Sequence, residues 1–465
     1  MSKPGVPRSG WQVAINAPGP SGGQMLKSFG RIRRDPLQFL AAIWREYGDV
    51  AQFPIPRPAV YLLTDPDAVR DVLVSSARDY TKRTLQYDNL ATVTGSGLLT
   101  ADDPPWRERR RVIQPAFHHE RLAGVADHAV AAVDPYLARW QRLRDGTVVD
   151  VDEAMMELSL QVVASALFGS TWDSQARELT QATLIALDQV VARARNPLAP
   201  PLNWPTPGST RLRRSIRTLD AAVADVLTAR RSTGVAAPVD RSDLVDMLLA
   251  ARIDPAAQLD GSGVRDELVT FLVAGHETVA STMTWVWHLL ASNPAAAAAL
   301  HAEVDSVLAG RLPTFADVPD LTWTRAIVDE TLRLYPPAWV ITRKSTAEHQ
   351  ALEVAMPTGS LVIMSPYLVH RHPDAWDRPE EFDPSRFLGG STRRDAYLPF
   401  GLGPRLCIGR DMALLEATLV VAAIASRFRF ETAGGQAVEA LASVTLRPEH
   451  GLPMRVYARS PSAIE

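Results

Sequence analysis

Residues 400–410, FGLGPRLCIGR, hold Cys407, the single cysteine of the 465-residue chain. Gly401 and Gly403 allow sharp turns that other residues resist. Cys407 directly precedes a helical pattern, and the free N–H groups at a helix N-terminus favour a thiolate. Arg405, two residues earlier, can meet an anionic group beside the sulfur. The stretch therefore predicts a thiolate that faces a large planar ligand with negatively charged groups.

Two neighbours of Cys407 also suit such a ligand. Gly409 lets a flat group approach the main chain, and Phe400 can pack against the far side of the sulfur. A lone cysteine is more often a small buried hydrophobe. However, the pattern Phe–x–x–Gly–x–Arg–x–Cys–x–Gly fixes five residue identities, and average residue usage gives a chance match on the order of 10⁻⁴ in a chain of this length.

The stretch FGLGPRLCIG resembles the haem-binding loop of the haem-thiolate monooxygenases, the cytochromes P-450. The resemblance covers nearly the whole chain. It implies haem b (iron protoporphyrin IX) as cofactor, with Cys407 as the axial ligand of the iron. It also implies a mostly α fold with minor β, a triangular helical prism with small sheets. We expect residues 1–25 to form a flexible leader and residues 26–465 a single domain.

The apolar segment 266–291 predicts a buried helix. Phe271, Ala274, Gly275 and Thr278 share one face of that helix. Gly275 costs about 1 kcal/mol relative to Ala in a helix interior, and the Thr278 hydroxyl can bond the carbonyl of Ala274. Both effects predict a local groove. A helix that packs tightly on a neighbour through its small residues is the alternative.

The sequence AGHET within this helix resembles the oxygen-binding stretch of the family. The resemblance implies that Thr278 hydrogen-bonds dioxygen and that Glu277 relays protons from water, with Ala274 and Gly275 forming the groove. The dipeptide His276–Glu277 also suggests a zinc hydrolase. That motif needs a second histidine at position 280, which is Ala280, so we reject it.

The stretch DETLRLYPP places Glu330 and Arg333 three residues apart on one helix. By spacing alone this is an ordinary surface pair. The resemblance implies instead that the pair is buried and joined by Arg386 of FDPSRF. We assign all three residues to structure, holding the backbone beneath the cysteine loop.

The helical stretch WRERRR puts Trp106 and Arg110 on one face. The resemblance implies that they reach a haem propionate, together with Arg343 and Arg405. The remaining arginines of the stretch predict a solvated basic face or a docking surface for an acidic redox partner; they are Arg107, Arg109 and Arg111.

By the same analogy, the substrate pocket draws on four separate segments of the chain. They are mostly apolar or small, and favour a hydrophobic small molecule of terpenoid, fatty-acyl or polyketide-like type. The predicted pocket residues are Leu85, Leu99, Phe271, Ala338, Trp339, Val340, Ile341 and Val444.

The composition excludes several other classes of function. The chain has 49 basic and 52 acidic residues, which gives no basic footprint for nucleic acid. One cysteine excludes an intramolecular disulfide and a Cys-rich metal site. No apolar run approaches about 18 residues, and the N-terminus lacks the apolar run of a signal peptide. We expect a cytoplasmic monomer without a membrane anchor.

The segment after Cys407 is too short for a fused reductase, so we expect separate electron donors, a ferredoxin with its reductase or a flavodoxin. The predicted reaction inserts one atom of O₂ into the substrate. Two alternatives are a peroxygenase that uses H₂O₂ and a non-catalytic haem sensor or carrier. The pair Glu277–Thr278 favours the monooxygenase over both.

The local patterns also predict several elements. Residues 59–64 indicate a strand, followed by a helix with Asp65 as its N-cap. Residues 354–370 predict short strands, and residues 444–458 alternate like a hairpin. The proline-rich stretch 195–209 is a linker by composition, whereas the resemblance makes it a loop between two lid helices.

Overall fold

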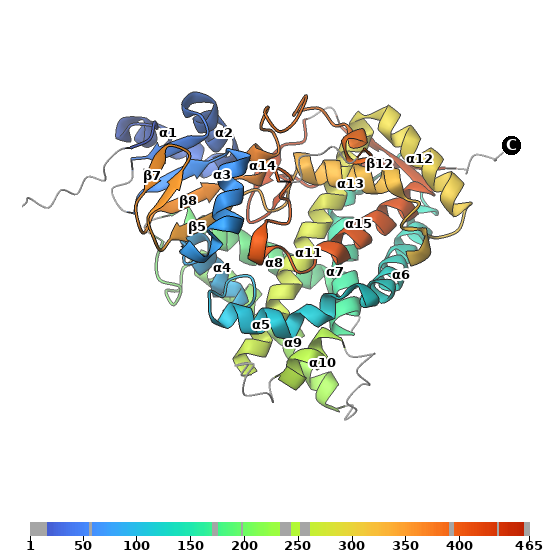
Figure 1. Ribbon diagram of the computed structural model, residues 1–465. Helices are drawn as coiled ribbons and strands as arrows, with labels where there is room; N and C mark the ends of the chain where they lie inside the picture. The colour runs from blue at the N-terminus through green and yellow to red at the C-terminus, as the bar shows by residue number, and fades with distance from the viewer. Residues whose placement is uncertain are drawn as a thin grey trace, which may run out of the picture.

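Helices dominate the computed structural model, which describes residues 16–54, 58–169, 175–196, 199–232, 243–251, 261–389, 395–434 and 437–459. Their ribbons form a roughly triangular outline (Figure 1). The helices are α1 (Gly22–Arg34), α2 (Pro36–Tyr47), α3 (Pro66–Arg70), α4 (Leu85–Thr94), α5 (Pro105–Ile113), α6 (Leu122–Trp140), α7 (Val151–Phe168), α8 (Ala176–Ala194), α9 (Pro207–Ser232), α10 (Leu244–Ala251), α11 (Gly261–Ser292), α12 (Pro294–Leu308), α13 (Thr322–Leu334), α14 (Pro366–Val369) and α15 (Arg410–Ala425).

The strands form small separate sheets. The largest has the order β1-β2-β8-β5-β3, and the others are β4-β12-β9, β10-β11 and β6-β7. The strands are β1 (Val50–Phe53), β2 (Val60–Leu63), β3 (Tyr80–Thr81), β4 (Thr147–Asp150), β5 (Ile341–Ser345), β6 (His349–Ala351), β7 (Val354–Met356), β8 (Leu361–Met364), β9 (Phe428–Thr432), β10 (Ala440–Ala442), β11 (Leu446–Pro448) and β12 (Pro453–Ala458). In Figure 1, β5, β7 and β8 lie near the N-terminal helices on one side, and β12 lies beside α12 on the other. This architecture confirms the expected mostly α fold with minor β.

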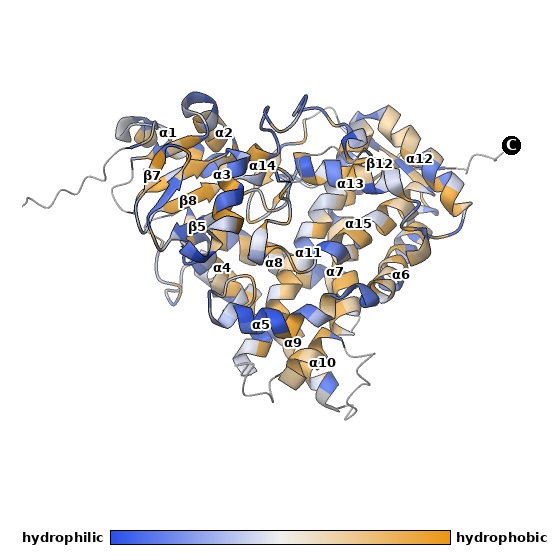
Figure 2. Cartoon of the chain, viewed as in Figure 1, coloured by the Kyte–Doolittle hydropathy of each residue, from blue (hydrophilic) through white to orange (hydrophobic). Residues whose placement is uncertain are grey.

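The core is built around α7, α11 and α15, which are buried along most of their length. In Figure 2, α15 is mainly orange, whereas α11 mixes orange with white and blue residues. Helices α7 and α11 run antiparallel, because Asp152 contacts Thr284 near one end of the pair and Val163 faces Gly275 nearer the other. The Asp150 carboxylate caps α7 by accepting the N–H groups of the first turn.

Two local predictions from the sequence agree with the structure. The strand predicted over 59–64 is β2, and Asp65 caps α3 by accepting the N–H of Ala68. The stretch 195–209 joins α8 to α9, and these two helices pack against each other in the same core cluster. The stretch is therefore a loop between two packed helices rather than a linker, as far as its described residues show; that these helices form a lid over the pocket stays a prediction.

The predicted C-terminal hairpin is wrong. Strand β11 pairs with β10, whereas β12 lies between β4 and β9 in another sheet. Their apolar residues serve different cores: Leu446 packs with the N-terminal helices, and Met454 and Val456 pack against the main cluster. Residues 354–370 form β7 and β8 as predicted, but α14 follows from Pro366.

The two ends of the chain bear on the remaining expectations. Residues 1–15 of the predicted leader lie outside the described part of the chain, and its boundary at residue 25 falls inside α1. That helix begins at Gly22 because the Ser21 side chain caps it, accepting the N–H of Gln24. Across the described residues, no helix combines the length and the apolar character that crossing a bilayer requires.

Candidate active site

A cavity of about 330 Å³ lies between α11, the cysteine loop and the segment that joins α4 to α5. Its lining is mostly apolar, with a few polar and charged groups at its edges. Cys407 and Thr278 both line it, although they come from elements far apart in the sequence. A concave apolar site with a few convergent polar groups is the usual form of a small-molecule site.

The cysteine loop is tightly shaped. Gly401 and Gly403 have φ values of 72° and 68°, in the left-handed region that favours glycine. A Cβ on Gly403 would also lie 2.1 Å from the carbonyl oxygen of Leu73, so no other residue fits there. The N–H of Cys407 donates to the carbonyl of Phe400 at 3.0 Å. The loop thus presents the Cys407 side chain, which is exposed, to the cavity.

The prediction of an intrinsically favoured thiolate needs a correction. Desolvation within the protein raises the pKa of Cys407, and it outweighs the N–H of Gly409 and the charges of Arg110 and Arg410, which lower it. The helix N-terminus and the arginines alone therefore do not produce the thiolate. A metal ion coordinated by Cys407 would supply the deprotonation, because a coordinating metal deprotonates a thiol outright.

Helix α11 carries its predicted groove. The Thr278 hydroxyl donates to the carbonyl of Ala274 at 2.8 Å, and Thr282 repeats this bond one turn later, to Thr278. Gly275 lines the cavity, but a Cβ there would also meet Val163 of α7 at 3.1 Å. Close packing on α7 therefore also contributes to the need for glycine, as the alternative interpretation of this helix proposed.

Glu277 is almost fully buried beside the cavity. Burial raises the pKa of its carboxyl to about 7, while the Thr445 hydroxyl and the charge of Arg447 partly oppose this shift. The neighbouring His276 is also buried, and burial lowers its pKa to about 4, so the ring is neutral at pH 7. One α11 side chain at the cavity therefore exchanges a proton near neutral pH.

A second carboxyl, that of Glu416 in α15, also borders the cavity and is buried. Its Oε1 has no hydrogen-bond partner within the described part of the chain. Burial raises its pKa to about 8, and the hydroxyl of Ser159 lowers it only partly. The group is therefore mainly protonated at pH 7.

The buried ion pair expected for Glu330 and Arg333 is present. The guanidinium donates to both carboxylate oxygens, at 2.7 and 2.8 Å, and neither side chain is exposed. Arg386 approaches the same carboxylate at 3.4 Å, and the N–H of Asp383 donates to it at 2.8 Å. Arg333 also donates to three backbone carbonyls, those of His370, Pro379 and Glu381.

His370 connects this network to the cysteine loop, and the sequence analysis missed it. Its Nδ1 lies 3.0 Å from the carbonyl of Arg333, and its Nε2 lies 2.9 Å from the N–H of Leu398. The carbonyl needs a donor and the N–H an acceptor, which fixes the neutral tautomer with the proton on Nδ1. Burial lowers the pKa of the ring to about 3, in agreement with this tautomer.

Four basic side chains border the cavity: Lys82, Arg110, Arg343 and Arg405. Lys82, Arg343 and Arg405 lie close enough to repel one another and form a cationic edge. Arg405 stacks over the ring of Trp106, with its Cζ 3.9 Å from the ring centroid. Burial and the charges of Arg343 and Arg405 hold the pKa of Lys82 well below its usual range. An anionic ligand would relieve this repulsion, since opposite charges stabilise each other.

Comparisons with known proteins agree with this site. The sequence model of the Cytochrome P450 family matches residues 18–451. The chain belongs to the cytochrome P450 family. It is 37% identical over 408 residues to cyclooctatin synthase of Streptomyces melanosporofaciens, covering 86% of this chain and 87% of that protein.

Two further P450 relatives are similar in extent. Cyclooctat-9-en-7-ol 5-monooxygenase of the same organism is 37% identical over 411 residues, or 86% of each chain. Pentalenene oxygenase of Streptomyces avermitilis is 33% identical over 437 residues, 93% of this chain and 95% of its own. The protein is therefore a haem-dependent P450 monooxygenase, which uses O₂, an organic substrate and electrons from redox partners.

The residues at the cavity fit a haem. Gly409 has neither a left-handed φ nor a protein atom within 3.4 Å of an added Cβ, so the protein itself does not explain the glycine. A flat ligand on the cavity side does. The cluster of cations suits two propionates, and the single cysteine supplies the soft ligand that P450 iron takes.

The predicted pocket residues are mostly placed at the cavity. Leu99, Phe271, Ala338, Val340, Ile341 and Val444 line it. Leu85 does not: as the first residue of α4 it is 63% exposed, and Gln86, Tyr87 and Leu90 line the cavity instead.

Trp339 is also a wrong assignment. It packs in the N-terminal core and donates to the carbonyl of Ser443 at 2.9 Å. The side chain of Trp339 thus points away from the cavity that Ala338, Val340 and Ile341 line. From the sequence alone, every residue of the stretch 338–341 was equally suited to the pocket.

Contrary to the prediction, the three remaining arginines of the basic helix α5 do not all lie on a solvated face. Arg107 and Arg111 are exposed and pair with Asp103 and Glu108, as a solvated face does. Arg109 is only 12% exposed and pairs with the buried Glu267 of α11 at 3.3 Å. Its assignment to the solvated face is wrong, because α5 turns this residue inward.

Lys82 is a second site residue that the sequence did not reveal. It is buried, and its Nζ donates to the carbonyl of Leu99 at 2.7 Å. A lysine in a polar stretch is normally exposed, so nothing in its local sequence marked it.

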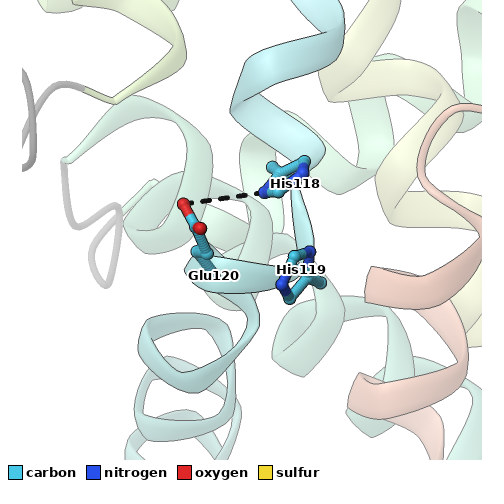
Figure 3. Close-up of side chains that lie close together, drawn as sticks. All are labelled: His118, His119 and Glu120. Carbon is cyan, nitrogen blue, oxygen red and sulfur yellow. Dashed lines mark ion pairs between the residues drawn. The ribbon is translucent and has the colours of Figure 1, made fainter.

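A separate cluster of possible metal ligands lies on the turn before α6, shown in Figure 3. His118 and Glu120 form an ion pair of 3.7 Å, and one ligand atom from each residue, with His119, lies within 4.8 Å of the others. All three side chains are exposed. Consecutive exposed residues on a turn approach each other without a metal, so we assign no ion to this cluster.

Proposed function

We propose that this P450 oxidises a terpenoid, by hydroxylation or a related oxygen insertion, in the cavity between α11 and the cysteine loop. The observation that carries the proposal is a single apolar cavity bordered by Cys407, Thr278 and Glu277. The names of cyclooctatin synthase and pentalenene oxygenase support the substrate class.

The cofactor supplies the difficult step: haem iron with a thiolate ligand activates O₂ and favours O–O cleavage. The chain's own residues bind and orient. Cys407 would hold the iron, and Arg110, Arg343, Arg405 and Trp106 would hold the propionate edge. Phe400, Gly401 and Gly409 shape the surface that faces the flat ligand.

The protons come from α11. The Thr278 hydroxyl borders the cavity and donates to the carbonyl of Ala274, so its oxygen can still accept a hydrogen bond from a small ligand there. Glu277 has a pKa near neutrality, which suits a group that gains and loses a proton in each turnover. We assign delivery of protons to Glu277 and their positioning to Thr278.

The apolar lining selects the substrate. Leu99, Phe271, Val340 and Val444 offer hydrophobic contacts from four different elements, and no carboxylate other than Glu277 and Glu416 borders the described cavity. A compact hydrocarbon with few polar groups fits this lining. We further propose a monomer that receives electrons from a ferredoxin with its reductase or from a flavodoxin, within the cytoplasm.

The first test asks whether Cys407 is the iron ligand. The reduced CO complex of the wild-type protein should show the red-shifted Soret band of thiolate ligation, and Cys407→Ser should lose it completely. Cys407→Ser that keeps this band would overturn the assignment.

The second test asks for the substrate class. Wild-type protein with ferredoxin, its reductase, reduced nicotinamide and O₂ should oxidise cyclic terpene hydrocarbons faster than fatty acids or macrolactones of similar mass. Turnover with H₂O₂ alone at the same rate would favour a peroxygenase. Turnover of fatty acids only would refute the terpenoid assignment.

A further inference from the structure

Two adjacent carboxylates in the first half of α11 hold the loop between α4 and α5. Asp266 accepts the N–H of Ser96 at 2.7 Å, and Glu267 accepts the N–H of Leu98 at 2.9 Å. Alternate amides of the loop therefore end on neighbouring acidic side chains. Such bonds to charged acceptors are about twice as strong as neutral ones.

The loop backbone lies directly on the helix. A Cβ on Gly95, whose φ is 67°, would fall 2.0 Å from Oδ1 of Asp266. A Cβ on Gly97 would fall 2.1 Å from the hydroxyl of Thr270 and 2.8 Å from the carbonyl of Asp266. The two glycines are needed for this approach, which brings the amide of Leu98 within reach of Glu267.

Glu267 is fixed on its other side as well. Its Oε1 lies 3.3 Å from Nη1 of Arg109 in α5, and the carboxyl is fully buried. Burial raises the pKa of Glu267 to about 7, while the Leu98 N–H and Arg109 lower it and Asp266 raises it further. The carboxyl thus joins α11, the loop and α5 at one point.

The opposite end of the loop is tied to the cationic edge of the cavity. Lys82 donates to the carbonyl of Leu99 at 2.7 Å, and Arg405 donates to the carbonyl of Ala101 at 2.7 Å. Leu98 and Leu99 lie between the bond to Glu267 and the bond to Arg405, and their side chains line the cavity. Glu267 itself does not line it, so any effect of Glu267 on the substrate must pass through the loop.

We propose that Glu267 is a positioning residue that sets the pocket wall formed by Leu98 and Leu99 and thereby decides which hydrophobic substrates the enzyme accepts. This rests on the proposed function to the extent that the cavity is the substrate pocket. Asp266 provides a matched comparison, because it holds the amide of Ser96, two residues before Leu98, and Ser96 is exposed and does not line the cavity.

The test compares haem-loaded Glu267→Ala, Glu267→Gln and Asp266→Ala with the wild-type protein. Dissociation constants come from the spin-state shift with a panel of terpenoids graded in size, and imidazole serves as an iron ligand too small to need the wall. Hydrogen exchange of peptides covering residues 95–101 reports the loop directly and needs no activity.

Glu267→Ala should weaken the preferred terpenoid about tenfold, the loss expected for a hydrogen bond to a charged group. It should also reorder the panel by size and speed exchange at Leu98, while imidazole affinity stays within about twofold. Glu267→Gln keeps an acceptor for the Leu98 N–H, so its ranking should stay near that of the wild type. Asp266→Ala should speed exchange at Ser96 and leave the ranking unchanged.

An unchanged ranking in Glu267→Ala would overturn the proposal, as would an identical change in Asp266→Ala. If Glu267→Ala fails to load haem, Glu267→Gln and Arg109→Met decide. The proposal requires that Arg109→Met speed the hydrogen exchange of residues 95–101 and alter the substrate ranking. It is wrong if the exchange rate and the ranking of Arg109→Met both stay at wild-type values. Failure of the proposed function is distinct, since the wild-type protein would then give no spin-state shift with any terpenoid.

Discussion

Helices α13 and α11 each bury a glutamate near the same cavity, but they treat its charge in opposite ways. In α13, Glu330 meets Arg333 through two hydrogen bonds, and Arg386 and the N–H of Asp383 complete its shell. In α11, burial raises the pKa of Glu277 to about 7, and Arg447 opposes this only partly.

The difference follows from the cost of burying a charge. An isolated buried carboxylate is expensive, and it stays charged only when partners and hydrogen bonds compensate it. Glu330 has this compensation and remains a fixed part of the scaffold. Glu277 has only part of this compensation, and its raised pKa leaves a carboxyl able to exchange a proton close to physiological pH, as its proposed role requires. One glutamate is suited to holding the cysteine loop and the other to moving a proton.

The largest effect is expected when the α13 network loses its carboxylate. Glu330→Ala leaves two buried or nearly buried arginines without their partner, a change that typically costs about 3–5 kcal/mol. We expect mostly haem-free or insoluble protein, measured by the ratio of Soret to protein absorbance and by thermal unfolding. The control is Glu108→Ala, which removes the carboxylate of the surface pair with Arg111. It should leave the absorbance ratio and the Tm unchanged. A haem-loaded Glu330→Ala protein with normal Tm would show that Glu330 is not a required part of the scaffold, and the contrast with Glu277 would be lost.

A smaller and different effect is expected on α11. Thr278→Ala should preserve folding and haem content, because Ala is the better helix former. A positioned proton-transfer group contributes about 10²–10⁴-fold to a reaction. We therefore expect a large fall in product formed per reduced nicotinamide, with hydrogen peroxide released in its place. Thr282→Ala, one turn further along α11, is the matched control. Wild-type coupling in Thr278→Ala would withdraw the role of Thr278 and leave that of Cys407 intact.

The smallest effect is expected for Glu416 of α15, a buried carboxyl whose pKa is raised like that of Glu277 in α11. Its folded pKa of about 8 lies above the ordinary value of 4.5. Between these values the unfolded chain releases a proton that the folded chain keeps, so the free energy of unfolding falls as pH rises. Glu416→Gln imitates the protonated form and removes this dependence. We expect its Tm to exceed that of the wild type by about 2–5 °C at pH 8 and to match it near pH 4.5.

The control for Glu416 is Glu353→Gln, since Glu353 is exposed. It should leave Tm unchanged at both pH values. A Glu416→Gln protein that is destabilised equally at pH 4.5 and pH 8 would show instead that the charged carboxylate supports the fold.

The sequence by itself determined those features in which chemistry and spacing coincide. The loop around Cys407 needs a glycine with positive φ at position 403, and the sequence pattern shows Gly403 and the cysteine at a fixed spacing. Glu330 and Arg333 lie on one helix three residues apart, so their proximity follows from helix geometry. The bond from Thr278 to Ala274 is likewise local to one helix. The family, the cofactor and the mostly α fold followed from these motifs.

Only the tertiary structure decided which side chains of a short stretch turn inward. Arg109 and Arg107 are both arginines of one basic helix, yet only Arg109 meets the buried Glu267, because α11 packs against that face. Trp339 leaves the cavity although its neighbours line it. Such choices depend on contacts between segments far apart in the chain.

The same reason explains the unforeseen roles of Lys82, His370 and Glu267. Each makes its deciding contacts with a residue that is between 17 and 169 positions away, namely Leu99, Arg333 or Leu98. A local pattern carries no information about such partners. The electrostatics of the site are therefore a property of the fold: a buried carboxyl keeps or loses its charge according to what remote segments place beside it.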